Sequence, residues 1–244
     1  MRTVKLTIEY DGTIYHGWQV QPGLTTIQGL LQDQLSRILG HRVHVYGSGR
    51  TDAGVHAKGQ VAHFHTPKSL PTEVICRALN GSLPCDITIR RAEEDHSSFH
   101  AQYDAKGKEY HYYIFNQPIR CPFSRNYALL VRPPLDLDPM QEALTHLKGT
   151  HDFFSLSVAS EDMKNTIRTL RKAELIQKDN FLVIILEGNG FLHKMVRRIV
   201  GTLIGVGRHK IPSSIIPEIL QNRDKSLGGL SVPPNGLFLM SVKY

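Results

Sequence analysis

The chain opens with a regular alternation of apolar and polar residues from Val4 to Tyr10. A period of two residues is typical of a strand with one buried face. The motif Thr25-x-x-Gln28 has the form of a helix capping box. Apolar residues follow it at helical spacing, and a first strand and a first helix are therefore predicted; the helix positions are Leu31, Leu35, Ile38 and Leu39.

Two further β-like runs, residues 41–47 and 59–66, enclose a glycine-rich segment. A short helix opening at Thr72 and a strand over residues 87–93 complete the first half. The second half repeats this mixture of strands and helices. We expect strands at 109–116 and 126–131, a helix from Asp138-Pro139 to Gly149, a hairpin of 171–177 with 181–188, a helix over 191–204 and a closing strand over 236–244.

Strands interleaved with two main helices in each half predict an α+β fold with mainly antiparallel sheets. The charged, glycine-containing run DAKGK at residues 104–108 interrupts the apolar pattern. We therefore expect two α+β domains, residues 1–105 and 106–244, with no low-complexity linker between them.

Charge adds a preference of partner to this picture. Lys and Arg total 29 against 22 Asp and Glu, a formal net charge of +7, and the cations gather in short clusters. Fixed positive charge favours a polyanion, because phosphate contacts release condensed counterions. Charge alone leaves the simpler interpretation open, in which these clusters are solvated surface.

Localisation is predicted from three features. Cys76, Cys85 and Cys121 are odd in number and form no C-x-x-C pair, which favours reduced thiols over a disulfide framework. The opening stretch carries acidic residues where a signal peptide needs an apolar run. The most apolar helix, within residues 191–207, carries Lys and Arg, so no membrane span is expected. We expect a cytoplasmic protein.

Several familiar motifs are absent or incomplete. The glycine pair Gly54 and Gly59 is followed by Gln60-Val61, which lacks the lysine and hydroxyl of a P-loop. The glycine-rich segment lacks the third glycine of a dinucleotide site, and no hydrolase elbow G-x-S-x-G occurs. His63 and His65 share one strand face, but no third ligand is evident in the sequence around them. No metal or cofactor is expected.

The segment Gly47 to His56 displays one carboxylate, Asp52, between an arginine and a glycine. Glycines and small residues let a backbone approach a ligand closely, so this loop could present a nucleophile or a base in a positive field. An Asp beside a glycine is more often only a turn former. Spacing alone does not decide between the two interpretations.

The residues 49–56, GRTDAGVH, resemble letter for letter a signature of the TruA family of pseudouridine synthases. The resemblance continues in family order through four further blocks. They are YDGTIYHGWQ with TTIQGLLQ (residues 10–32), FHAQYDAKGKEYHYYIFN (99–116), GNGFLHKMVRRIVGTLIGVG (188–207) and PPNGLFLMSVKY (233–244).

This resemblance implies two ferredoxin-like domains with mainly antiparallel sheets meeting at a central basic cleft, and a homodimer. It also implies cofactor-free isomerisation of uridine to pseudouridine, at positions 38, 39 and 40 of the tRNA anticodon stem-loop, with Asp52 as the catalytic carboxylate. Arg197 falls on the family's active-site arginine and Tyr110 on its active-site tyrosine. Three roles remain open for Asp52: attack on the sugar, attack on the base, or abstraction of a sugar proton.

Basic residues near these positions are expected to contact RNA, namely Arg50, Lys106, Lys108, Lys194 and Arg198. The chain departs from the family's usual residues at Gln102, Leu156 and His193, which affects RNA contact and pocket packing rather than the reaction. Two other classes stay open. An RNA-binding module without activity would share the charge and fold, and a metal-dependent nuclease would need clustered acids, of which Glu93-Glu94-Asp95 is the nearest example.

Overall fold

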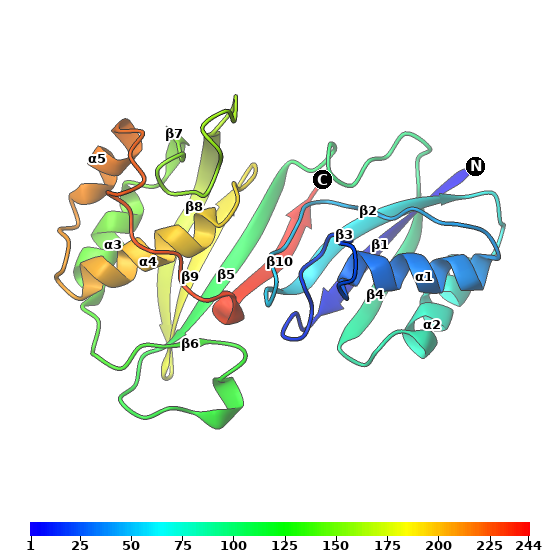
Figure 1. Ribbon diagram of the computed structural model, residues 1–244, viewed down its shortest axis with the longest axis horizontal. Coiled ribbons are helices and arrows are strands. Elements are labelled where there is room, and N and C mark those ends of the chain that lie inside the picture. Colours follow the sequence, from blue (N-terminus) through cyan, green and yellow to red (C-terminus); the bar gives the residue numbers. More distant parts are fainter. The chain divides into compact units, whose positions relative to one another are not determined.

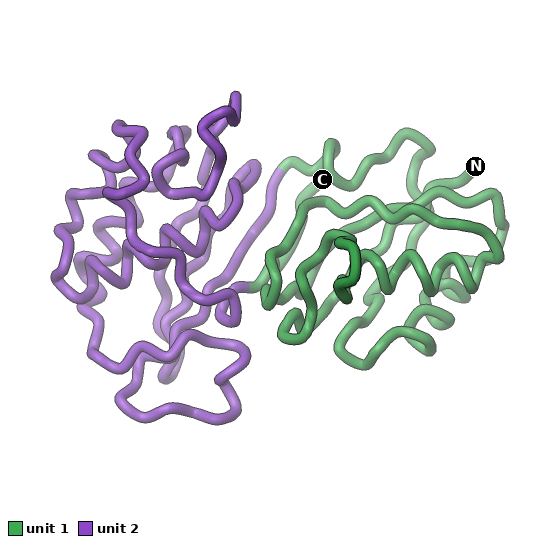
Figure 2. Tube along the Cα trace, viewed as in Figure 1, with its two compact units in different colours: residues 1–106, 238–244 green, residues 107–237 purple.

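The computed structural model describes all residues from 1 to 244 and contains ten strands and five α-helices. The chain forms two compact units, one of residues 1–106 with 238–244 and one of residues 107–237 (Figure 2). The predicted α+β class with mainly antiparallel pairing is confirmed.

The first unit has the strand and helix order β-α-β-β-α-β, with one strand added from the end of the chain. Its sheet runs β4-β1-β3, and the free edge of β3 receives β2 in antiparallel and β10 in parallel pairing. This is the topology of a ferredoxin-like unit with a very short second strand. The elements are β1 (Arg2–Tyr10), α1 (Ile27–Leu39), β2 (Tyr46–Gly47), β3 (His56–Thr66), α2 (Thr72–Ser82), β4 (Ile87–Asp95) and β10 (Leu237–Lys243).

Helices α1 and α2 lie together on one face of this sheet (Figure 1). The predicted alternation in β1 is confirmed, because Val4, Leu6 and Ile8 are fully buried. Leu31 and Leu35 of α1 are also fully buried, which confirms the helical spacing. Burying such side chains stabilises a fold by roughly 1.5–3 kcal/mol each.

The start of α1 differs from the predicted capping box. Thr26, not Thr25, caps the helix, and its hydroxyl accepts from the Gly29 N–H. Gln28 instead accepts from the Val20 N–H at 2.9 Å and donates to the Val45 carbonyl at 2.8 Å. The glutamine therefore joins two loops, a task that local spacing does not reveal.

The second unit has a sheet in the order β5-β9-β8-β7, all antiparallel, with β6 parallel to β5. Helices α3 and α4 pack against one another, and α3 also contacts β8. The elements are β5 (Gly107–Phe115), β6 (Leu129–Leu130), α3 (Leu137–Thr145), β7 (Gly149–Asp152), β8 (Ile167–Lys178), β9 (Phe181–Gly188), α4 (Met195–Gly207) and α5 (Ile215–Gln221).

Both main helices of this unit begin elsewhere than predicted. Asp136 caps α3 by accepting from the Asp138 N–H, so the helix starts before the Asp138-Pro139 pair. Helix α4 starts at Met195, because Lys194 adopts the left-handed conformation with φ 56° and ends the preceding turn. Residues 191–194 are therefore a loop, and α4 extends to Gly207 rather than stopping at 204.

The division of the chain also differs from a single cut after residue 105. The first unit extends to Lys106 and regains residues 238–244. Phe238 and Leu239 pair with His56 and Ala57 of β3, where the GRTDAGVH segment ends. The closing strand thus supports the segment that carries Asp52.

Candidate active site

Asp52 lies in the first unit, in the loop between β2 and β3. The Val55 N–H donates to the Asp52 carbonyl at 3.2 Å, and Gly54 has φ 77°, which together make a tight turn. A positive φ is accessible to glycine at little steric cost. The side chain of Asp52 is partly exposed, so the turn presents the carboxylate at the surface of the unit.

The segment that follows β1 holds this loop by its backbone. The Trp18 N–H donates to the Thr51 carbonyl at 3.0 Å, and the Gly54 N–H donates to the Tyr15 carbonyl at 3.3 Å. The Tyr10 and Thr51 hydroxyls are hydrogen-bonded at 2.8 Å. Burial raises the pKa of Tyr10 to about 12, so this hydroxyl keeps its proton at neutral pH. Hydrogen bonds therefore hold Thr51 and Gly54, on either side of Asp52 in the sequence.

Three glycines allow the two segments to approach this closely. A Cβ on Gly12 would lie 2.0 Å from the Val55 carbonyl oxygen, and one on Gly17 would lie 2.5 Å from the Thr51 carbonyl oxygen. A Cβ on Gly47 would lie 2.5 Å from the Trp18 ring. None of these contacts leaves room for a side chain, which explains why the sequence blocks at residues 10–19 and 47–56 occur together.

A buried glutamine, Gln60, holds the start of the Asp52 loop by hydrogen bonds to Ser48 and Gly49. Gln60 accepts from the Ser48 hydroxyl at 2.8 Å and donates to the Gly49 carbonyl at 3.0 Å, and both side chains are fully buried. His56 accepts from the Gly12 N–H at 3.0 Å through Nδ1. Sequence reasoning missed Gln60, Ser48 and Tyr10 as supporting residues, because their partners are set by the fold.

Tyr110 lies in the second unit, on β5 opposite Leu186 of β9. Its side chain is 8% exposed, and its ring meets the Phe191 ring edge-to-face with centroids 5.0 Å apart and planes 77° apart. Such a contact fixes the plane of the tyrosine ring.

Arg197 is also in the second unit, in the first turn of α4. Its Nε donates to the Val232 carbonyl at 2.7 Å, and the Val232 N–H donates to the Arg197 carbonyl at 3.3 Å. This reciprocal pair holds the guanidinium end of the side chain against the backbone at Val232. Its neighbour Arg198 donates to the Lys225 carbonyl and is half-buried, and burial lowers the pKa of its guanidinium. Arg198 therefore has a structural role in addition to any contact with RNA.

The remaining predicted cations divide between the units. Arg50 and Lys106 are exposed in the first unit, and Lys194 is half-buried beside α4 in the second. Burial and the neighbouring charge of Arg168 lower the pKa of Lys108. Arg168, which the sequence reasoning did not select, is thus close enough to Lys108 to affect its pKa. Lys108 precedes Tyr110 by two positions on β5, so their side chains lie on the same side of the strand.

The predicted site residues accordingly fall into two groups. The first unit carries Asp52 and Arg50 on one supported loop, and the second carries Tyr110, Arg197 and their basic neighbours.

Comparison with known proteins identifies the family of this chain. A sequence model of the tRNA pseudouridine synthases matches residues 6–104 and 143–244. The chain belongs to this family. Its relatives include proteins named tRNA pseudouridine synthase A from Ruminiclostridium cellulolyticum, 45% identical over 100% of both chains, and from Exiguobacterium sp., 44% identical over 100% of this chain and 98% of the relative. A third, from Thermoanaerobacter sp., is 42% identical over 100% of both chains.

Solved structures give a more remote likeness. An archaeal box H/ACA sRNP Nop10-Cbf5 complex aligns over 80% of this chain and 44% of that chain, with 13% identity and a TM-score of 0.35. That likeness is too remote for a functional inference.

The departures from the family's usual residues lie in different surroundings. Leu156 is fully buried, whereas Gln102 and His193 are exposed. The His193 carbonyl accepts from the Val158 N–H at 2.9 Å, so its backbone has a structural contact whatever the side chain does.

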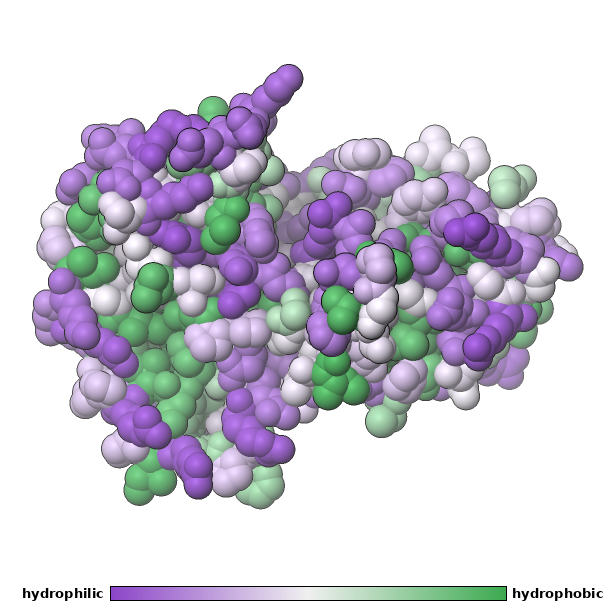
Figure 3. Space-filling model, viewed as in Figure 1, coloured by the Kyte–Doolittle hydropathy of each residue, from purple (hydrophilic) through white to green (hydrophobic).

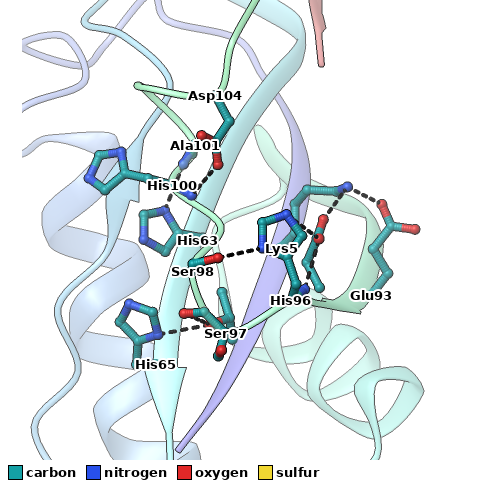
Figure 4. A network of polar contacts seen from close by, with 12 residues as sticks. Lys5, His63, His65, Glu93, His96, Ser97, Ser98, His100, Ala101 and Asp104 are labelled. Carbon is teal, nitrogen blue, oxygen red and sulfur yellow. Dashed lines mark hydrogen bonds and ion pairs between the residues drawn. The ribbon is translucent and has the colours of Figure 1, made fainter.

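The histidine pair of β3 has a third imidazole beside it. His63 and His65 have ring centroids 5.2 Å apart, and His100 lies 4.8 Å from His63 (Figure 4). Sequence reasoning saw no third histidine here, because His100 is distant along the chain. Their Nδ1 atoms face protein partners, namely the Ala101 N–H for His63, the Thr3 hydroxyl for His65 and the Tyr103 N–H for His100. The structure contains no group of three or more His, Cys, Asp or Glu that could hold a metal ion.

None of the helices is long and apolar enough to cross a bilayer.

Proposed function

We propose that Asp52 is the catalytic carboxylate of the reaction that family membership gives this chain, the isomerisation of uridine to pseudouridine in tRNA. The reaction breaks the bond between N1 and C1′, turns the base and rejoins it through C5. A carboxylate can stabilise or bond to the detached sugar or base. The observation that carries the proposal is the geometry of the loop, in which hydrogen bonds and glycine contacts fix the backbone around one partly exposed carboxylate.

Tyr110 and Arg197 are proposed as active-site support. Arg197 supplies a fixed cation to balance the carboxylate, and its bond to the Val232 carbonyl supports this role by pre-setting the side chain. Tyr110 offers a flat ring for the displaced uracil, and its hydroxyl can relay the C5 proton. Its contact with Phe191 supports a fixed ring plane.

The substrate sites are proposed to be positions 38, 39 and 40 of the tRNA anticodon stem-loop, in keeping with relatives named tRNA pseudouridine synthase A. Arg50 is proposed to hold a phosphate or to fill the space left by the flipped nucleotide. Further phosphate contacts are assigned to Lys106, Lys108, Lys194 and Arg198, and the position of Arg168 beside Lys108 adds it to this set.

A homodimer is proposed for the assembled enzyme. Ile119 and Phe123 are 78% and 88% exposed. Figure 3 shows that other hydrophobic residues also lie at the surface of the second unit. Burial against a second copy would remove that apolar surface from water.

We also place the enzyme in the cytoplasm, where tRNA is found and where three free thiols stay reduced.

Asp52→Asn tests the proposal, because asparagine keeps the size and hydrogen bonding but not the charge. We expect normal folding and tRNA binding with essentially all pseudouridine formation lost. The assay measures pseudouridine and chain integrity on the same unmodified tRNA, so that an RNA-binding module gives neither product and a nuclease gives cut chains. Turnover at a tenth of the wild-type rate or more in the variant would remove Asp52 from the catalytic role.

A further inference from the structure

A row of aromatic rings crosses the first unit beside β3 and is not part of the Asp52 loop. Tyr46 stacks on His63, with centroids 5.1 Å apart and planes 21° apart. His63 meets His100 at 4.8 Å, and His100 stacks on Tyr103 at 4.1 Å with an interplanar angle of 24°. The four rings therefore form one continuous set of contacts.

The outer end of this row is open to solvent. Tyr103 is 78% exposed although one face of its ring rests on His100. The exposure means that the remaining surface of the ring is available to another flat group. An ordered, exposed aromatic ring backed by a second ring is a natural stacking surface for a nucleobase.

The position of Tyr103 is fixed by the turn that carries it. The Nδ1 atom of His100 accepts from the Gln102 N–H at 3.2 Å and the Tyr103 N–H at 3.3 Å. The His100 N–H donates to the Asp104 carboxylate at 2.7 Å, and the Ala101 N–H donates to His63 at 3.1 Å (Figure 4). A preorganised ring loses little conformational freedom when it binds a ligand.

His63, the ring that His100 contacts inside the unit, carries no charge near neutral pH. Burial and the nearby His100 and His65 lower the pKa of His63 to about 4, against the opposing effect of Asp104. The ring below His100 is thus a neutral imidazole that packs as an aromatic group.

Positive side chains accompany the aromatic ones. Val43 and Val45 are buried while Arg42, His44 and Tyr46 are exposed, so these three side chains share the outer face of the extended segment. Arg50 follows toward Asp52 on the same stretch of chain. Aromatic rings interleaved with cations are the pattern by which proteins bind unpaired nucleotides.

We propose that Tyr103, backed by His100, stacks on one unpaired base of the RNA substrate. Single-stranded RNA is the fitting class of ligand, because stacking needs a base that is free of its neighbours. The identification of that RNA as tRNA rests on the proposed function.

Three substitutions separate stacking from bulk and hydrogen bonding. Tyr103→Phe keeps the ring, Tyr103→Leu keeps an apolar side chain without it, and Tyr103→Ala removes both. Because the side chain is exposed, all three are expected to fold with an unchanged melting temperature, which circular dichroism checks. We expect about tenfold weaker RNA binding for the alanine and leucine variants and nearly wild-type binding for phenylalanine.

The experiment uses an anticodon stem-loop in which each loop nucleotide in turn lacks its base. At one position the missing base should weaken wild-type binding and have no further effect on Tyr103→Ala, which identifies the stacked base by a double-mutant cycle. Additive effects at every position, equal binding by wild type and Tyr103→Ala, or equal losses for phenylalanine and alanine would each overturn the inference. Pseudouridine formation by the wild type is measured in parallel. If it occurs while these binding outcomes fail, only the stacking inference is lost, and if it does not occur, the proposed function fails on its own.

Discussion

Arg197 is fixed to the backbone at Val232 within its own unit, and its charge has two possible roles. A phosphate contact and a partner for the catalytic carboxylate would both need a cation here. We expect Arg197→Met to lower the single-turnover rate at saturating enzyme by at least about a hundredfold, with a much smaller effect on tRNA affinity. The reason is that a phosphate contact contributes to binding, whereas the carboxylate's partner acts in the bound complex.

Arg197→Lys is the matched control for this measurement. Lysine keeps the charge but lacks the planar guanidinium whose Nε reaches Val232. Partial recovery of the single-turnover rate is expected. A wild-type rate in Arg197→Met, accompanied only by weaker binding, would show that Arg197 contacts phosphate and nothing more.

His63 predicts a pH dependence of stability. Its folded pKa of about 4 lies below the ordinary value of 6.5, because the side chain is buried beside His65 and His100. As the pH falls, the unfolded chain binds this proton before the folded protein does. The contribution of His63 to the free energy of unfolding is therefore fully present above pH 6.5 and is lost as the pH falls from 6.5 to 4. The shift corresponds to about 3 kcal/mol of free energy of unfolding.

His63→Asn tests this dependence, since asparagine can still accept the Ala101 N–H that His63 Nδ1 accepts. Urea denaturation at pH 7 and pH 4.5 gives the loss of stability on acidification for each protein. We expect that loss to be about 2 kcal/mol smaller in the variant. Equal losses in the two proteins would mean that other groups account for the acid sensitivity.

Single residues were predicted from the sequence with uneven success. Asp52, Tyr110 and Arg197 came from the family signature, and their roles stay predictions. Local pattern could not supply the contact of His63 with His100, or the electrostatic effect of Arg168 on Lys108, because each joins positions far apart in the sequence. Such pairs arise from strand register and tertiary packing.

At the scale of elements, strong periodicity predicted the existence of helices and strands better than their ends. Strand β1 and helix α1 were correct, but the expected strand over residues 41–47 is limited to Tyr46–Gly47. The alternating burial of residues 42–46 is present, but pairing with β3 is limited to Tyr46 with His63 and Gly47 with Ala62. The helix caps were displaced by one or two positions, because several polar residues near each terminus could serve.

The contact of the segment after β1 with the Asp52 loop yields a prediction at this scale. Gly12→Ala would place a Cβ 2.0 Å from the Val55 carbonyl oxygen, so one backbone must move. We expect pseudouridine formation to fall at least about tenfold and the melting temperature to drop by several degrees. Gly81→Ala is the control, since its added Cβ meets nothing within 4 Å in helix α2 and should leave activity unchanged. Similar activity in the two variants would show that the close approach is not needed for the reaction.

The whole molecule shows why a single sequence boundary was insufficient. The charged run at residues 104–108 does lie where one unit ends, at Lys106. Strand β10 nevertheless returns to pair with β3, and no local property of residues 238–244 indicates which unit they join. Return of the chain to an earlier sheet depends on tertiary pairing, which a linear pattern of apolar residues does not encode.

The charge of the whole molecule gives the last prediction, a strong dependence of tRNA affinity on salt. With 29 Lys and Arg against 22 Asp and Glu, phosphate contacts should provide much of the affinity, and log affinity should fall linearly with log salt concentration. Lys106→Ala should reduce the steepness by about 0.7 to 0.9, the effect of one lost phosphate contact. Lys172→Ala removes the same charge from a residue of β8 outside the proposed set of phosphate contacts, and should leave the slope nearly unchanged. Filter binding or fluorescence anisotropy across a salt series measures all three proteins. A flat dependence in the wild type would mean that the basic surplus does not serve RNA binding, and equal slopes for the two variants would remove Lys106 from the RNA contact surface.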